Sequence, residues 1–382
     1  RAPADLPKEG GRYDLPIALA LLVASEQLDA SRLKQYEFIG ELALTGALRG
    51  VPGAISSAME AIKAGRQIIV AEDNAAEVGL IEGHECLVAG HLQEVCAFLE
   101  GRHALNPSIP EEEHPDDSLP DLSDVIGQQQ GKRALEIVAA GGHNLLLIGP
   151  PGTGKTMLAS RLPGLLPPLS NQEALESAAI LSLLSRYRAT KQWRRRPFRS
   201  PHHSASLAAM VGGGSIPIPG EISLAHNGVL FLDELPEFER RVLDALREPI
   251  ESGKIHISRT RAKIDYPAHF QLIAAMNPSP TGHYRGHHNR ASPEQTLRYL
   301  SRLSGPFLDQ FDLSLEIPLP PPGALSQAAS GVENSASVRK RVLVARDKQL
   351  ARQEEPFRML ATTLSADPFI GRILTGRVRS EE

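Results

Sequence analysis

The sequence predicts an α/β protein in which helices cover both faces of a parallel sheet, with a smaller α/β domain before it. Three observations indicate this fold class. Apolar, strand-like runs alternate with helical patterns between residues 127 and 322. One of these runs, NLLLIG, leads into a glycine-rich turn that opens a helical pattern. An acidic, proline-rich stretch separates this region from an earlier one that also mixes helical and strand patterns.

The composition limits the class of protein. With 382 residues, 41% of them hydrophobic, the chain is long and apolar enough for two or three packed domains. The formal net charge of -4 means that any nucleic-acid-binding surface must be local. Cys86 and Cys96 are typical of reduced thiols, and no apolar run is long enough to span a bilayer. We therefore expect a cytoplasmic protein without a membrane partner and, because it starts at Arg1 rather than Met, a fragment.

Residues 1–101 form the first predicted domain. Residues 14–28, DLPIALALLVASEQL, are almost entirely apolar and predict a buried helix. Residues 54–65 have amphipathic helical spacing ended by glycine, and residues 66–71 predict a buried strand after it. Residues 102–121 are rich in proline and acid, which predicts an exposed linker; a docking site for a basic partner is the less favoured alternative.

Residues 122–322 form the second predicted domain. Its strands are NLLLIG, GVLFLDE and FQLIAAMN, with helices and loops between them. A proline-rich run over residues 317–325 follows, and residues 337–353 predict one basic helix. Beyond residue 354 the sequence has no convincing pattern.

The glycine-rich turn predicts a nucleotide site. Gly149-x4-Gly154-Lys155-Thr156 has P-loop spacing, and it lies between a strand-like run and a helical pattern. Glycines let backbone N–H groups point inward at phosphate oxygens, and the following helix adds its positive end. We expect ATP and Mg²⁺ to bind here. The predicted nucleotide-binding residues are Gly149, Pro150, Pro151, Gly152, Thr153, Gly154, Lys155, Thr156 and Met157.

Polar side chains end the other two strands. Asp233 and Glu234 close GVLFLDE, and Asn277 closes FQLIAAMN. We expect Asp233 to complete the Mg²⁺ shell with Thr156, and Glu234 to deprotonate the attacking water. Asn277 is placed to contact the γ-phosphate. The predicted catalytic set is Lys155, Asp233, Glu234 and Asn277, and the predicted metal ligands are Thr156 and Asp233.

These motifs and the residues between them resemble AAA+ ATPases of the magnesium-chelatase-like group, most closely the YifB/ComM type of bacteria. The resemblance is carried by LSDVIGQQQGKRALEIVAAGGHNLLLIGPPGTGKT, by FRSPHHSASLAAMVGGGSIPIPGEISLAHNGVLFLDELPEF and by LREPIESGKIHISRTRAKIDYPAHFQLIAAMNP. It implies that residues 122–322 are a P-loop AAA+ core. It also implies that residues 323–382 hold an incomplete helical lid and an atypical tail.

Residues 1–101 resemble the Lon-protease-like domain (ribosomal S5 domain 2-like) that precedes the ATPase in this group. The position of the Lon serine is occupied by Arg12, and the position of its lysine is close to Ile55. A nucleophile needs a base within hydrogen-bond reach. With neither present, the resemblance implies an incomplete, non-proteolytic domain.

The resemblance implies a homo-hexameric ring that moves along single-stranded or branched DNA and drives branch migration or helicase-type remodelling in recombination or natural transformation. SGKIHISRTRAKIDYP, residues 252–267, predicts a β-hairpin, and similar hairpins project into the channel of related rings. We expect its tip to carry DNA contacts that neutralise phosphates without reading sequence. The predicted DNA-binding residues are Lys254, Arg259, Arg261 and Lys263.

Two further clusters leave their interpretation open. Residues 186–199, RYRATKQWRRRPFR, interleave arginines with aromatic residues; a DNA contact and a solvated loop with a packed Trp193 are both open. His202 and His203 are adjacent, so on an extended backbone we expect them to point apart and not to form a metal pair.

The sequence departs from the group at two places. Cysteines common after AAMNP are missing, leaving His283, His287 and His288, for which exposed loop histidines are favoured over a zinc site. Gln310 stands where relatives have an arginine that reaches the neighbouring subunit's nucleotide, and Arg302 is a candidate substitute. Loss of such an arginine costs about 10³–10⁵ in turnover.

Two other functions therefore stay open. The chain could be a nucleotide-binding subunit with weak or no turnover, as Gln310 and the incomplete lid suggest. It could also be a chelatase-type motor for metal insertion, against which the Lon-like first domain argues.

Overall fold

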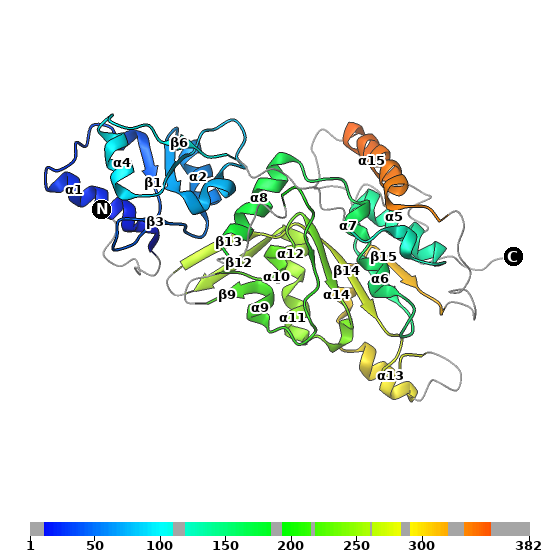
Figure 1. The fold of residues 1–382 in the computed structure, drawn as a ribbon. Coiled ribbons are helices and arrows are strands. Elements are labelled where there is room, and N and C mark those ends of the chain that lie inside the picture. Colours follow the sequence, from blue (N-terminus) through cyan, green and yellow to red (C-terminus); the bar gives the residue numbers. More distant parts are fainter. Residues whose placement is uncertain are drawn as a thin grey trace. The chain divides into compact units, whose positions relative to one another are not determined.

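The computed structural model describes seven stretches of the chain (Figure 1), which are residues 11–109, 119–184, 193–214, 218–259, 262–283, 291–319 and 332–352. The chain divides by its internal contacts into two compact units. Unit 1 comprises Arg1–Pro115 and Ser170–Arg195, and unit 2 comprises Asp116–Leu169 and Arg196–Glu382. Within the described stretches, no helix combines the length and apolarity that crossing a membrane requires.

Unit 1 contains a four-stranded sheet in the order β1-β4-β5-β6, in which β6 is antiparallel to β5 and the other pairs are parallel. Its strands are β1 (Tyr36–Phe38), β4 (Gln67–Ala71), β5 (Leu87–Ala89) and β6 (Asn106–Pro107), with a small ribbon of β2 (Glu41–Leu42) and β3 (Leu48–Arg49). Its helices are α1 (Asp14–Ala24), α2 (Ala54–Lys63), α3 (Ala75–Val78), α4 (Leu92–Leu99) and α8 (Asn171–Ser182). The helix and strand predicted over residues 54–71 are confirmed as α2 and β4.

Helix α8 joins unit 1 although it lies within residues 122–322 of the sequence. Ala178 of α8 packs with Ile55 and Leu80 in one buried cluster. The backbone N–H of Gly53 also donates to the carbonyl of Ser182 at 2.8 Å. Long-range packing therefore groups residues 170–195 with the first unit, which local sequence patterns do not reveal.

Unit 2 is built on a five-stranded parallel sheet in the order β15-β7-β14-β11-β8. The predicted parallel sheet is therefore confirmed. Its strands are β7 (Leu145–Ile148), β8 (Phe198–Arg199), β11 (Gly228–Leu232), β14 (Phe270–Met276) and β15 (Leu313–Glu316). All residues of β11 are buried, as expected for a central strand covered on both faces.

Helices flank this sheet. Leu147 and Phe231 face one core cluster together with Leu135 of α5 and Val342 of α15. The helices of unit 2 are α5 (Gln129–Gly141), α6 (Lys155–Ala159), α7 (Leu162–Leu165), α9 (Leu207–Val211), α10 (Glu221–Leu224), α11 (Arg240–Ala245), α12 (Arg247–Ser252), α13 (Pro293–Leu300), α14 (Gly305–Leu308) and α15 (Ser335–Arg352). The predicted basic helix is confirmed as α15, which packs against α5 (Figure 1).

Two short antiparallel ribbons complete unit 2. One pairs β9 (Gly212–Gly213) with β10 (Ile218–Pro219), and the other is the hairpin of β12 (Lys254–Arg259) and β13 (Ala262–Pro267). The predicted hairpin over residues 252–267 is thus confirmed.

The strand order brings three functional segments to one edge. β14 lies between β7 and β11, with Met276 opposite Ile148 and Leu232 opposite Ala274. Since parallel strands end at the same edge, the glycine turn after β7, Asn277 after β14 and Asp233 after β11 are neighbours. Ligands of open α/β sheets bind at this carboxyl edge.

Asn144 ties the outer strand β15 to the middle of the sheet. Its amide nitrogen donates to the Gln310 carbonyl at 2.8 Å, and its Oδ1 accepts from the Leu272 N–H at 2.8 Å. Alanine at this position would leave both partners unpaired. We expect Asn144→Ala to lower the free energy of unfolding of unit 2 by about 1–3 kcal/mol in urea titrations. Ser314→Ala, at an exposed position of β15, is the matched control; an equal effect of both variants would contradict the prediction.

Candidate nucleotide site

The turn between β7 and α6 depends on its glycines. Gly152 and Gly154 have φ angles of 78° and 84°, in the left-handed region that favours glycine. A Cβ on Gly149 would lie 2.4 Å from the carbonyl oxygen of Ile317. Larger residues at these positions would therefore distort the turn that the P-loop spacing predicts.

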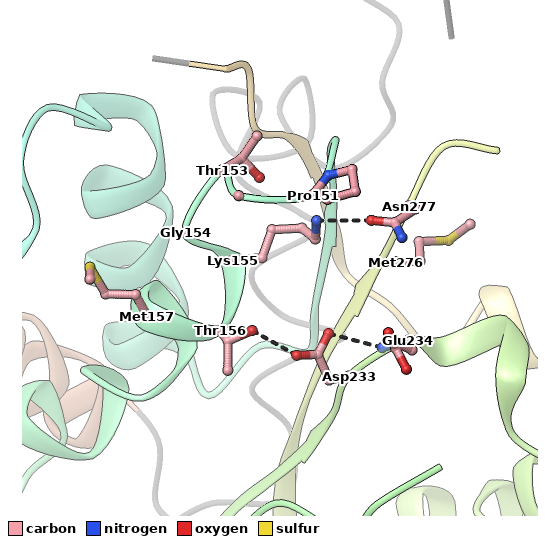
Figure 2. A pocket seen from close by; sticks show the side chains of 11 residues that line it. Pro151, Thr153, Gly154, Lys155, Thr156, Met157, Asp233, Glu234, Met276 and Asn277 are labelled. Atoms are coloured by element: carbon pink, nitrogen blue, oxygen red, sulfur yellow. Dashed lines mark hydrogen bonds between the residues drawn. The ribbon is translucent and has the colours of Figure 1, made fainter. Parts of the chain in front are cut away.

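Lys155 begins α6 and turns its side chain toward the turn and β14. Its Nζ donates to the carbonyls of Gly149 at 2.7 Å and Pro150 at 3.0 Å, and to Oδ1 of Asn277 at 3.2 Å (Figure 2). Burial lowers the pKa of Lys155, and the charge of Asp233 counteracts this. A phosphate oxygen would be a stronger partner for this ammonium than neutral carbonyls.

Thr156 and Asp233 form a pair of oxygen donors. The Thr156 hydroxyl donates to Oδ2 of Asp233 at 2.6 Å, and Oδ1 of Asp233 accepts from the Glu234 N–H at 2.9 Å (Figure 2). Hydroxyl and carboxylate oxygens are the ligands that Mg²⁺ takes in proteins. This pair could therefore contribute to a magnesium site.

A cavity of about 430 Å³ collects these groups. Its size is within the usual range for small-molecule sites. All four predicted catalytic residues line it. The lining residues are Pro151, Gly152, Thr153, Gly154, Lys155, Thr156, Met157, Asp233, Glu234, Met276 and Asn277. Gly149 and Pro150 are predicted nucleotide-binding residues that do not line the cavity, but their carbonyls accept hydrogen bonds from Lys155. Met276 lines the cavity and is not predicted from the sequence, because its apolar side chain gives no chemical signal.

The structure adds a histidine beside Glu234. Nδ1 of His203 lies 3.0 Å from Oε2 of Glu234. The prediction that His202 and His203 point apart is wrong: their ring centroids are 4.1 Å apart at 35°. The chain turns at residues 203–204 and is not extended there, which brings the rings together. The adjacent histidines are visible in the sequence, but their position beside Glu234 depends on this turn and could not be predicted from the pair alone.

The predicted DNA-binding residues lie at different positions along the β12–β13 hairpin. Lys254 is exposed and lies opposite Pro267, at the open end of the hairpin, so the prediction that the tip carries it is wrong. Arg259 and Lys263 belong to the strand segments next to the turn. Arg261 lies outside the described residues.

His256 makes a cross-strand pair in the same hairpin. Its Nδ1 lies 2.7 Å from Oδ1 of Asp265, and this hydrogen bond and the Asp265 charge raise the pKa of His256 above 6.5. We expect an NMR titration to show a His256 midpoint above that value. In Asp265→Asn the midpoint should fall back toward 6.5. An unchanged midpoint in that variant would exclude Asp265 as the cause.

The described part of the second basic cluster makes internal contacts. Arg199 donates twice to the Glu221 carboxylate at 2.7 Å, and Arg196 donates to the carbonyls of Pro167 and Asn227. Trp193 packs against the cluster that contains Ile55. These contacts favour the packed alternative; residues 185–192 lie outside the described part.

Gln310 and Arg302 are both engaged within their own chain. Nε2 of Gln310 lies 3.3 Å from Oε1 of Glu251. Arg302 donates to Oε2 of Glu237 at 2.8 Å and to the Pro236 carbonyl at 3.1 Å. As placed here, Arg302 is committed to the loop that follows Glu234.

Three other predicted positions can be located. The Arg12 guanidinium donates to the Pro52 carbonyl, and Ile55 is fully buried. His283 folds back on Ser279, whose hydroxyl donates to its carbonyl at 2.8 Å. His287 and His288 lie outside the described residues, among which no cluster of three or more His, Cys, Asp or Glu could hold a metal ion.

Comparison with known proteins places this geometry in a family. The family described as magnesium chelatase, subunit ChlI, matches residues 121–332, and the family described as subunit ChlI of Mg-chelatase matches residues 2–74. The uncharacterized protein YifB of Salmonella typhimurium is 76% identical over 93% of this chain and 70% of its own length. Competence protein ComM of Haemophilus influenzae is 60% identical over 92% and 70%. The magnesium-chelatase 38 kDa subunit of Cereibacter sphaeroides is 26% identical over 52% and 59%. The chain therefore belongs to the magnesium-chelatase-like AAA+ family and is of the YifB/ComM type.

Proposed function

We propose that the chain is an ATP-hydrolysing AAA+ motor that acts on DNA. One observation carries the hydrolytic part: Lys155, the Thr156–Asp233 pair and Glu234 meet at one sheet edge around one cavity. A P-loop alone needs only to bind a nucleotide. Hydrolysis also requires an acid that can accept a proton from water, and Glu234 lies beside the Thr156–Asp233 pair that would hold the metal.

The residues present fit a triphosphate and its magnesium ion. Gly152 and Gly154 have left-handed backbone conformations, which favour glycine. Because glycine has no side chain, the N–H groups of this turn stay accessible to phosphate oxygens. Lys155 would bind phosphate, and Thr156 and Asp233 would hold Mg²⁺. When bound, the ion neutralises charge that develops on the phosphates.

The proposed reaction needs one proton acceptor. The oxygen of a water molecule bonds to the γ-phosphorus, the bond from that phosphorus to the β–γ bridging oxygen breaks, and ADP and phosphate result. The Glu234 carboxylate accepts the proton that the water loses. Asn277, which holds Lys155 in the structure, would turn to the γ-phosphate.

The DNA part of the proposal rests on the hairpin and on the relatives. Repeated around a homo-hexamer, the hairpin cations would contact phosphates of single-stranded or branched DNA. The relative named as a competence protein supports a role in natural transformation or recombination, by branch migration or helicase-type remodelling. We place this activity in the cytoplasm, where such DNA is found.

ATPase rates with and without DNA test the proposal. We expect single-stranded DNA or a four-way junction to stimulate turnover, and higher salt to weaken the stimulation. A variant with Lys254, Arg259, Arg261 and Lys263 changed to glutamine should keep its basal rate and lose the stimulation. Flat rates with every DNA would reject a DNA motor while leaving ATP hydrolysis intact.

Gln310 favours a second candidate, a nucleotide-binding subunit with weak turnover. A neutral amide cannot supply the charge of the arginine that the resemblance to AAA+ ATPases implies at this position. If this limits the chain, Gln310→Arg should raise turnover well above that of the unmodified protein. An unchanged rate would show that the residue at position 310 is not limiting.

A further inference from the structure

The loop that follows β14 reaches the glycine turn at several points. The carbonyl of Met276 accepts from the Gly149 N–H at 3.1 Å, and Oδ1 of Asn277 accepts from Nζ of Lys155 at 3.2 Å (Figure 2). The first contact holds the start of the glycine turn, and the second holds its end. The middle of the turn, at Pro151, is exposed and meets the same loop further along the chain.

Residues 279–282 form a tight turn within that loop. The Gly282 N–H donates to the carbonyl of Ser279 at 2.9 Å, which closes the turn. Serine first, proline second and glycine fourth is the order typical of type I β-turns. Ser279 is 1% exposed, and its hydroxyl donates to the His283 carbonyl at 2.8 Å and accepts from the His283 N–H at 3.1 Å. The turn is therefore fixed at both of its ends.

Gly282 is the residue through which this turn meets Pro151. It is buried and has a φ angle of 85°, in the region that favours glycine. A Cβ placed on it would lie 2.7 Å from Cδ and 2.9 Å from Cγ of Pro151. Non-bonded carbon atoms are in best contact at about 3.5–4.0 Å, so a methyl group here must displace the proline ring. Because that ring is closed on the backbone nitrogen, displacing it moves the glycine turn itself.

We infer that the turn of residues 279–282 is a positioning element of the nucleotide site, which supports the glycine turn at Pro151 and keeps its N–H groups arranged for phosphate oxygens. Ordering a flexible turn costs conformational entropy, and support from outside removes part of that cost before ATP binds. The inference rests on the proposed ATP binding. It adds Gly282, which lies outside the P-loop motif, as the residue whose missing side chain permits the contact.

The experiment is a double-mutant cycle between residues 151 and 282 of the whole chain, measured by titration with a fluorescent ATP analogue. Gly282→Ala adds the methyl group, and Pro151→Ala removes both ring atoms that the methyl group would meet. We expect Gly282→Ala to weaken binding about tenfold or more, as overpacking a close contact does. In the Pro151→Ala chain, the same methyl group should change binding by less than about twofold.

Gly83→Ala is the matched control for backbone strain. Gly83 has a φ angle of 78°, and no neighbouring atom lies within 4 Å of a Cβ placed on it. The alanine there is strained like the alanine at position 282 but makes no contact, so affinity for the analogue should not change. Without nucleotide, hydrogen–deuterium exchange over residues 149–157 should be faster in Gly282→Ala and in Pro151→Ala than in Gly83→Ala. Exchange at the rate of the control in both variants would overturn the inference.

The binding data can overturn the inference in two further ways. Gly282→Ala could bind the analogue as tightly as the unmodified chain. It could also lose the same factor in the Pro151→Ala background, which would assign the loss to the strained φ angle and not to the contact.

Lys155→Ala distinguishes these results from a failure of the proposed function. If Lys155→Ala binds the analogue as tightly as the unmodified chain, the glycine turn is not the nucleotide site and the inference falls with the proposed function. If Lys155→Ala loses affinity while Gly282→Ala keeps it, only the inference is wrong.

Discussion

The Glu234→Gln variant should bind ATP nearly as tightly as the unmodified chain and hydrolyse it at least about a hundredfold more slowly. Glutamine keeps the size and hydrogen bonding of the side chain but cannot accept the proton of water. Glu234 lines the cavity and makes no direct contact with Lys155 or Thr156 through its side chain among the contacts described, so phosphate binding should survive. Equilibrium binding of a fluorescent ATP analogue and phosphate release measure the two effects separately.

Glu239→Gln is the matched control for this variant. Glu239 is an exposed acid on the same loop, before α11, and lies outside the cavity lining. It should hydrolyse ATP at the rate of the unmodified chain. If Glu234→Gln keeps that rate too, another group accepts the proton and the assignment of the base is wrong.

The Lys155→Ala variant should lose ATP affinity by about 10- to 100-fold. Charge-assisted hydrogen bonds contribute about 1.5–3 kcal/mol each, and Lys155 is the ammonium at the centre of the site. Its Nζ is held by Gly149 and Asn277, so it is already placed where phosphate would bind. Turnover should fall further than affinity, since the same charge stabilises the phosphates as they separate.

Lys348→Ala removes a lysine of the same charge from an exposed position on α15 and should leave both quantities unchanged. Titration with the fluorescent ATP analogue gives the affinities. Equal affinities of Lys155→Ala and Lys348→Ala would mean that the glycine turn does not hold the triphosphate.

The site could be predicted because its signals are local. β7, β11 and β14 are continuous apolar runs, as strands covered on both faces must be, and each run leads directly into a segment that the site uses. Parallel pairing then brings the glycine turn, Asp233 and Asn277 to one edge. The P-loop spacing then places Lys155 and Thr156 at the start of the helix that follows the turn.

The missed features depend on contacts that are distant in sequence. β8 has only two residues, and its strand geometry exists because β11 pairs with it. The position of His203 beside Glu234 depends on where the chain turns after β8, and the position of Lys254 depends on where the hairpin reverses. No pattern within a short window determines these positions.

Hydrogen–deuterium exchange with and without ATP and Mg²⁺ tests the central claim most directly, because that claim concerns backbone N–H groups. Saturating nucleotide should slow exchange in peptides covering residues 149–157, with weaker protection around Asp233 and Asn277, and Lys155→Ala should abolish it at the same ATP concentration. Protection elsewhere in the chain, with unchanged exchange over residues 149–157 at saturating ATP, would contradict the account.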